Sequence, residues 1–168
     1  MTSSVNNQRA KIKSRRGRKS PSRLTLWEQK FSKKLRKHHK HFAKKVFHRL
    51  MKKSSTLRST LKRRSKEYEV KFEISLEEVR EMLYKSYGKK CRYCSSTLVV
   101  ANMACDHIYP LSMGGDSTIY NLQMICQRCN TRKGPLTHKN FRRLLIWLKH
   151  QEKDLEQYVL RKMSSRDF

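Results

Sequence analysis

Residues 105–130, CDHIYPLSMGGDSTIYNLQMICQRCN, place an Asp–His pair before two glycines and end with a cysteine pair and an asparagine. Residues 103–111 and 121–125 are rich in apolar positions and are predicted to form two strands. Gly114 and Gly115 interrupt the pattern between them, as glycines commonly do in a loop. The stretch therefore predicts a strand–loop–strand hairpin that carries polar and metal-binding types of side chain.

Four of the five cysteines occur in two C-x-x-C pairs, Cys91 with Cys94 and Cys126 with Cys129. Each pair can present two thiolates to one ion from a tight turn, which is the usual construction of a tetrahedral structural Zn²⁺ site. Four buried thiols without a metal are the alternative. Cys105 lies outside the pairs and within a predicted strand, so we expect it to be a small buried apolar residue.

A strand and a capped helix are expected before the first cysteine pair. Residues 67–74, EYEVKFEI, alternate polar and apolar side chains, which is typical of a half-buried strand. Ser75 and Glu78 have the spacing of a capping box and predict the start of a helix, which Gly88 can end in a left-handed conformation. The globular domain is therefore expected to span 67–168.

Two helices are expected after the hairpin. One begins near Cys129 and is stopped by Gly134 and Pro135. Thr137 is predicted to cap a final helix that reaches about Val159. With the two strands, these elements predict a small α+β domain.

Positive charge is concentrated in the first part of the chain. Residues 1–66 hold 24 Lys or Arg and a single acidic residue, Glu28, so they carry +23 of the formal net charge of +28. Such an imbalance opposes compaction and is relieved by a polyanion, which makes nucleic acid the expected partner. Residues 1–23 are polar and cationic without periodicity, and we expect them to be a disordered tail.

The segment 24–66 is expected to be a basic helical arm with a linker. Thr25 begins a capping box, and apolar residues then recur at steps of four or seven as far as Leu50. The helix should end near residue 53, with a linker or frayed helix at 54–66. The basic face is either solvated or lies along phosphates, and we favour the second. The cations expected to contact phosphates there are Lys33, Lys34, Arg36, Lys37, Lys44 and Lys45.

The composition excludes two classes of protein. The chain has no run of about 18 apolar residues, so a transmembrane helix and a membrane partner are not expected. Its first residues lack the apolar core of a secretory signal, so we expect an intracellular protein of the cytoplasm, the nucleus or a virus-infected cell. In such a compartment the cysteines are more naturally metal ligands or buried thiols than disulfides.

The combined pattern resembles the HNH endonucleases of the ββα-metal class, in the zinc-bearing branch where two C-x-x-C pairs bracket the catalytic motif. The matching segments are C-R-Y-C, D-H-I-Y-P-L-S-M-G-G and N-L-Q-M-I-C-Q-R-C-N-T-R-K-G, within residues 88–148. The resemblance implies a small ββα-metal (His-Me finger) nuclease domain of the α+β class with a four-cysteine zinc site. It says little about residues 1–66.

The resemblance also implies a role for each polar residue of the motif. His107 would be the general base, since an imidazole can take a proton from water near neutral pH. Asp106 would bind a catalytic Mg²⁺ or Mn²⁺ through its carboxylate, and Asn130 would bind the same ion through its amide oxygen. Asn121 would hold the loop across the hairpin and thereby aim His107. Many members of the family have histidine at the position of Asn130.

These roles imply a metal-dependent endonuclease whose substrate is double-stranded DNA. Small HNH enzymes with basic extensions occur among homing, viral and restriction nucleases, and the sequence does not choose among these settings. His107 would deprotonate a water that attacks phosphorus in line, leaving 5′-phosphate and 3′-hydroxyl ends. Arg132 and Lys133 would either contact the phosphate backbone or lie on a solvated helix face. The alternative function is a non-catalytic zinc-ribbon protein that binds nucleic acid, and such a protein does not require Asp106, His107 and Asn130 together.

Overall fold

The computed structural model describes Gln29, Lys33 and residues 40–165. Its elements are α2 (Lys40–Glu67), β1 (Phe72–Glu73), α3 (Leu76–Ser86), β2 (Met103–His107), the 3-10 turn η1 (Leu111–Met113), β3 (Ser117–Thr118), β4 (Leu122–Cys126), α4 (Gln127–Lys133), α5 (His138–Leu148) and α6 (Lys153–Ser165). The predicted α+β class is confirmed. The tail predicted at 1–23 lies outside the described residues, as does most of the predicted helix before residue 40.

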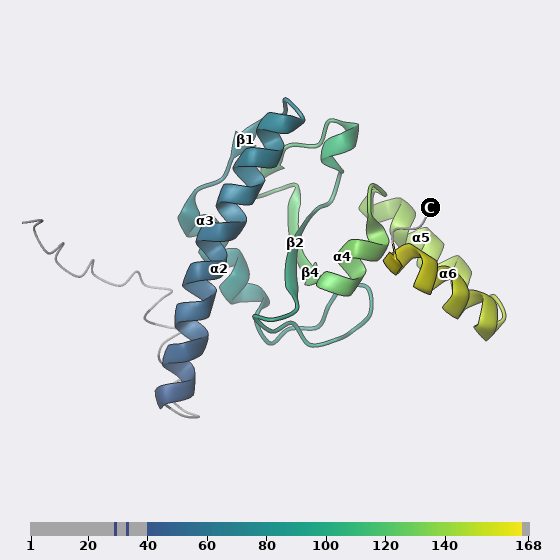
Figure 1. Cartoon of the computed structure of the whole chain (residues 1–168), viewed down its shortest axis with the longest axis horizontal. Helices are drawn as coiled ribbons and strands as arrows, with labels where there is room; N and C mark the ends of the chain where they lie inside the picture. The colour runs from purple at the N-terminus through teal and green to yellow at the C-terminus, as the bar shows by residue number, and fades with distance from the viewer. Residues whose placement is uncertain (1–28, 30–32, 34–39, 166–168) are drawn as a thin grey trace, which may run out of the picture.

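The predicted hairpin lies at the centre of the fold. β2 and β4 pair antiparallel, with Met103 opposite Cys126 and His107 opposite Leu122. α2 and α3 lie on one side of this pair, and α4, α5 and α6 lie on the other (Figure 1). β1 and β3 form a second, parallel pair in which Phe72 is opposite Ser117. The hairpin is therefore held between two groups of helices.

Helix α2 continues through 54–66, where a linker or frayed helix was expected. Leu50, Ser54 and Leu61 are buried in it at spacings that keep them on one side of a helix. The Ser54 hydroxyl donates to the carbonyl of Met51 at 2.7 Å, so its burial leaves no unpaired polar group. The linker expectation was wrong because a small, internally bonded serine can occupy a packed helix face.

A single hydrophobic core joins α2 to the elements that follow it. Leu50 and Leu61 belong to the same buried cluster as Val79 and Leu83 of α3 and Ile125 of β4. The boundary expected between residues 66 and 67 falls within the last turn of α2. The described part of the expected arm is therefore packed against the rest of the fold.

The strand expected at 67–74 is confined to the two residues of β1. Glu67 still belongs to α2, and Glu69 follows it in a left-handed turn with φ of 53°. The N–H of Val70 bonds to the carbonyl of Ser65 at 3.0 Å and closes the end of the helix. Because β3 offers only two residues for pairing, the alternating pattern cannot extend into a longer ladder.

The predicted capping box of α3 is present. The Ser75 hydroxyl accepts from the N–H of Glu78 at 3.1 Å, and the Glu78 carboxylate accepts from the N–H of Ser75 at 2.7 Å. Gly88, after the end of the helix, has φ of 79°, the left-handed conformation expected there. Local sequence therefore fixes both ends of this helix.

The last helical segment is divided into α5 and α6. Thr137 caps α5 by accepting from the N–H of Asn140 at 3.2 Å, as predicted, but α5 ends at Leu148 instead of reaching Val159. The chain turns at 149–152, and α6 returns beside α4. There Arg132 donates to the Ser164 hydroxyl at 2.9 Å, a tertiary contact that no local pattern predicts.

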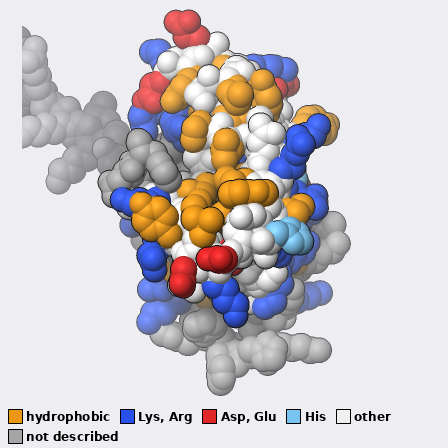
Figure 2. Space-filling model, turned by 90° about the vertical axis from the view of Figure 1, so that its right-hand side faces the viewer, with side chains coloured by type: hydrophobic (Ala, Val, Ile, Leu, Met, Phe, Trp, Pro, Cys, Tyr) orange, Lys and Arg blue, Asp and Glu red, His pale blue; other side chains and the backbone are white. Residues whose placement is uncertain are grey.

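Hydrophobic side chains gather on the face of the molecule that lies at the right of Figure 1 (Figure 2). The exposed large apolar residues of α5 and α6 are Ile146, Trp147, Leu155 and Tyr158. Among the helices that the structure describes, none combines the length and the apolar character that crossing a membrane requires.

The shared core predicts that α2 stabilises the whole fold. Leu50→Ala should lower the free energy of unfolding by about 2–5 kcal/mol, because it leaves a cavity in the core that α2 shares with α3 and β4. Thr60→Ala, at an exposed position of the same helix, should change it by no more than about 0.5 kcal/mol. Urea denaturation followed by circular dichroism measures both variants, and equal midpoints would show that α2 is not part of the core.

Candidate active site

The end of β2 presents the Asp–His pair. Asp106 and His107 are the last two residues of the strand, and both are buried. Asp106 lies opposite Gln123, and His107 lies opposite Leu122. Because neighbouring residues of a strand point to opposite faces, the pairing fixes how each of the two side chains is directed.

Helix α4 brings the third motif position to the same place. Asn130 of α4 lines a cavity of about 470 Å³ together with Asp106, His107 and Lys133. Arg64 of α2 lines it as well, from a segment that sequence reasoning did not connect with the site. The structure thus brings together the predicted base and both predicted ligands of the catalytic metal.

His107 is a neutral imidazole in this environment. Burial lowers its pKa to about 4, and the positive charges of Arg64 and Lys133 act in the same direction. Its Nε2 lies 2.9 Å from the hydroxyl oxygen of Ser117. At neutral pH the ring therefore has one nitrogen free of hydrogen, which is the state that a general base requires.

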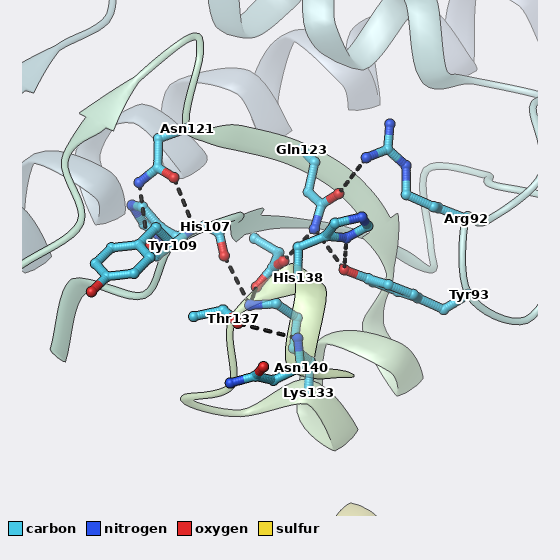
Figure 3. Close-up of polar contacts among 11 residues, drawn as sticks. Arg92, Tyr93, His107, Tyr109, Asn121, Gln123, Lys133, Thr137, His138 and Asn140 are labelled. Atoms are coloured by element: carbon cyan, nitrogen blue, oxygen red, sulfur yellow. Dashed lines mark hydrogen bonds and ion pairs between the residues drawn. The ribbon is translucent and has the colours of Figure 1, made fainter. Parts of the chain in front are cut away.

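Asp106 has a partner on each carboxylate oxygen. The Lys133 ammonium donates to Oδ1 at 3.0 Å, and the Gln123 amide donates to Oδ2 at 2.8 Å. Burial raises the pKa of Asp106, while the contacts with Gln123 and Lys133 oppose that shift. Lys133 also donates to the His107 carbonyl at 2.8 Å (Figure 3). This lysine therefore connects α4 to both residues of the Asp–His pair.

Asn121 connects the two ends of the loop. Its amide nitrogen donates to the carbonyls of Tyr109 at 3.0 Å and Asp116 at 2.8 Å, and its amide oxygen accepts from the N–H of Tyr109 at 2.8 Å. Gly115 also packs against this turn, since a Cβ at that position would lie 2.0 Å from the Tyr109 carbonyl oxygen. These contacts suit the loop-holding role expected of Asn121.

Arg92 and Tyr93, which lie between Cys91 and Cys94, join Gln123 in a polar network (Figure 3), and Gln123 in turn contacts Asp106. Arg92 donates to the Gln123 amide oxygen at 3.3 Å, and the Gln123 amide nitrogen donates to the Tyr93 hydroxyl at 2.9 Å. The Tyr93 hydroxyl lies 2.7 Å from Nδ1 of His138. Sequence reasoning missed these residues. The available signal was Gln123 itself, a polar residue in an otherwise apolar strand.

The four paired cysteines form a cluster that can hold a metal ion. The sulfur atoms of Cys91, Cys94, Cys126 and Cys129 all lie within 4.8 Å of one another. A tetrahedral zinc site with Zn–S bonds of about 2.3 Å keeps its sulfurs roughly 3.8 Å apart, so this donor set fits the ion. Cys105 is outside the cluster and half-buried, packed against the core.

The cavity lined by Asp106 and Asn130 offers donors suited to a hard divalent cation. Asp106 supplies a carboxylate and Asn130 an amide oxygen, both at the same cavity. Mg²⁺ is commonly bound by one or two carboxylates, with water and substrate phosphates completing its shell. The protein contacts of Asp106 leave it lone pairs for a metal, since each carboxylate oxygen can accept more than one bond.

The cations expected to bind nucleic acid differ in their surroundings. Lys133 is 1% exposed, so the solvated-face alternative was wrong for this residue: its ammonium is drawn inward by Asp106. Arg132 is half-buried against Ser164. The residues that remain exposed are Lys33, Lys44 and Lys45, and those outside the described part of the chain are Lys34, Arg36 and Lys37.

Comparison with known proteins identifies the same region. Residues 91–146, about a third of the chain, match a family model described as HNH endonuclease. A segment of 46 residues is 41% identical to the CRISPR-associated endonuclease Cas9 of Corynebacterium diphtheriae. This match covers 27% of this chain and 4% of the Cas9 chain. The family match includes both cysteine pairs and the hairpin, and it begins after α2 and α3.

The cysteine cluster predicts one equivalent of bound zinc. Cys126→Ser should lose the ion and leave the domain unfolded, because structural zinc contributes about 10 kcal/mol or more in small metal-dependent domains. Elemental analysis and circular dichroism measure the two effects. Cys105→Ser is the matched control and should keep its zinc, since Cys105 is not in the cluster. Zinc-free wild-type protein, or unchanged melting of Cys126→Ser, would contradict the assignment.

Proposed function

We propose that this chain, whose residues 91–146 belong to the HNH endonuclease family, is a metal-dependent endonuclease that hydrolyses phosphodiester bonds of double-stranded DNA. The observation that carries the proposal is the single cavity lined by Asp106, His107 and Asn130. A base and two oxygen donors at one cavity are the groups that metal-assisted hydrolysis needs.

His107 acts on the water nucleophile. As a neutral imidazole it accepts a proton, and the resulting hydroxide attacks the phosphorus in line with the leaving 3′ oxygen. The products then carry 5′-phosphate and 3′-hydroxyl ends. Asn121 holds the loop that follows β2 and so limits how far His107 can move from its working position.

Asp106 and Asn130 would hold the catalytic Mg²⁺ or Mn²⁺. When bound, such an ion offsets negative charge on the phosphoryl and leaving oxygens. Lys133 keeps the Asp106 carboxylate paired and oriented through Oδ1, while Gln123 orients it through Oδ2. Two donors from different elements therefore fix the direction of the carboxylate before substrate arrives.

The distribution of charge supports a polyanionic substrate. Arg64 adds positive charge at the cavity, and exposed Lys44 and Lys45 lie on the helix that also contributes Arg64. Residues 1–39 add 13 Lys or Arg against a single acidic residue. Cation clusters of this kind bind the phosphate backbone without regard to sequence.

A non-catalytic zinc-ribbon protein that binds nucleic acid is the second candidate. The cysteine cluster and the basic residues suit it equally well. A zinc-ribbon function does not explain why a neutral, buried His107 lies beside the paired carboxylate of Asp106 at one cavity. Cleavage therefore separates the two functions more directly than binding does.

We predict that the protein nicks or cuts plasmid DNA in the presence of Mg²⁺ or Mn²⁺. His107→Ala and Asp106→Ala should each lower the rate by at least about 100-fold, since each removes a group from the chemical step. Gel assays of supercoiled plasmid measure cleavage, and end-labelling identifies the 5′-phosphate. His150→Ala, at an exposed histidine outside the cavity, is the control and should retain activity.

The folding and the zinc content of each variant must be measured together with its cleavage rate. A folded, zinc-loaded His107→Ala protein that still cleaves within a few-fold of wild type would exclude His107 as the base. Wild-type protein that binds DNA but fails to cut it with either metal would favour the zinc-ribbon function.

Removing residues 1–39 should weaken DNA binding and leave the fold intact, because the described core residues of α2, Val46, Leu50 and Leu61, all lie after this segment. Neutralising 6–10 phosphates makes affinity fall about 10³–10⁵-fold between 50 and 200 mM salt. The full chain should show this steep dependence, and the shortened chain a shallower one. Equal salt slopes for two proteins with the same circular dichroism would exclude residues 1–39 as a principal DNA contact.

A further inference from the structure

The last turn of α2 reaches the Asp–His pair through two buried hydroxyls. Ser65 of α2 is 1% exposed, and its hydroxyl donates to the Ser117 hydroxyl oxygen at 2.6 Å. Ser117 is 0% exposed, and the same oxygen lies 2.9 Å from Nε2 of His107. Three side chains from α2, β3 and β2 thus form one continuous chain of hydrogen bonds.

The position of Ser117 is fixed from two sides. Its N–H donates to the carbonyl of Lys71 at 2.8 Å, and it pairs with Phe72 in the β1–β3 ladder. Its hydroxyl is held by Ser65 from α2. Because neighbouring residues hold both the backbone and the hydroxyl of Ser117, this hydroxyl can fix the orientation of the His107 imidazole.

The direction of the hydrogens decides which nitrogen of His107 is basic. A serine oxygen can accept two hydrogen bonds, so Ser117 can accept one from Ser65 and another from His107 Nε2. In the arrangement that suits a general base, the single hydrogen of the neutral ring is on Nε2, and the Ser117 oxygen accepts it. The lone pair is then on Nδ1, which leaves that nitrogen to accept the proton of water.

We infer that Ser117 and Ser65 are positioning residues for His107: they fix its tautomer and ring orientation, and α2 thereby completes the active site. The inference rests on the proposed role of His107 as general base. It adds a residue from outside 91–146 to the site, because Ser65 precedes the region that matches the HNH endonuclease family.

Another serine of the same helix provides a matched control. Ser54 is as deeply buried as Ser65, but its hydroxyl donates to the carbonyl of Met51 within its own helix. Ser65 bonds across to another element instead. The comparison separates the effect of removing a buried hydroxyl from the effect of removing the contact with Ser117.

The first test measures single-turnover cleavage of plasmid at saturating full-length protein. Ser117→Ala should lower the rate about 10- to 100-fold, as removal of the partner that orients a functional histidine does elsewhere. Ser65→Ala should give a smaller loss, because Ser117 keeps its backbone anchor. Ser54→Ala should cleave at the wild-type rate. Equal rates for all three variants and wild type would overturn the inference.

The second test reads the tautomer directly. Two-bond ¹H–¹⁵N correlation spectra of the histidine rings, with His107 identified by its absence in His107→Ala, should show hydrogen on Nε2 in the wild-type protein. Ser117→Ala should convert this signal to a mixture of tautomers, and Ser54→Ala should leave it unchanged. A slower Ser117→Ala protein whose His107 signal matches wild type would overturn the positioning role.

The two proposals fail in different ways. If His107→Ala cleaves like wild type, the proposed base is wrong, and the inference about Ser117 is overturned with it. If His107→Ala is inactive while Ser117→Ala has both wild-type activity and a wild-type spectrum, the proposed function stands and the positioning role alone is overturned.

Discussion

The register of the β2–β4 pair decides which side chains reach the cavity. Asp106 lies opposite Gln123, which donates to its carboxylate, and His107 lies at the end of the pair where the loop begins. A slip by one residue would turn every side chain of the strand to the other face. The cysteine cluster holds one end of the hairpin, and Asn121 holds the other. Two separate sets of contacts therefore oppose a shift of the strand register.

The electrostatics of the site differ from those of the chain as a whole. The formal net charge is +28, yet the two motif residues on β2 are a neutral imidazole and a carboxylate paired with a buried ammonium. Breaking a buried ion pair by removing one partner costs about 3–5 kcal/mol, because an uncompensated charge remains. Lys133 therefore stabilises the fold and also orients Asp106 at the site. The exposed cations are the ones proposed to contact a polyanion.

Local patterns predicted the parts of the structure that local interactions determine. The capping box at Ser75 and the cysteine spacing belong to this class, since each depends on residues a few positions apart. Other features depend on distant partners. Lys133 is buried because Asp106, 27 residues earlier, attracts it, and the serine pair that joins α2 to β3 spans 52 residues. The length of α2 was missed for a related reason: Ser54 is polar in sequence but packed in the fold.

The division of the cysteine ligands across the hairpin has a consequence for synthesis. Two sulfurs precede β2 and two follow β4, so the metal-binding set is incomplete until Cys129 has left the ribosome. Asn130 and Lys133 emerge after it, whereas the most basic part of the sequence, residues 1–66, precedes all of these groups. At roughly 5–20 residues per second, several seconds separate the two events. Under the proposed function, the nascent chain would carry its basic residues well before the groups proposed to cleave a polyanion.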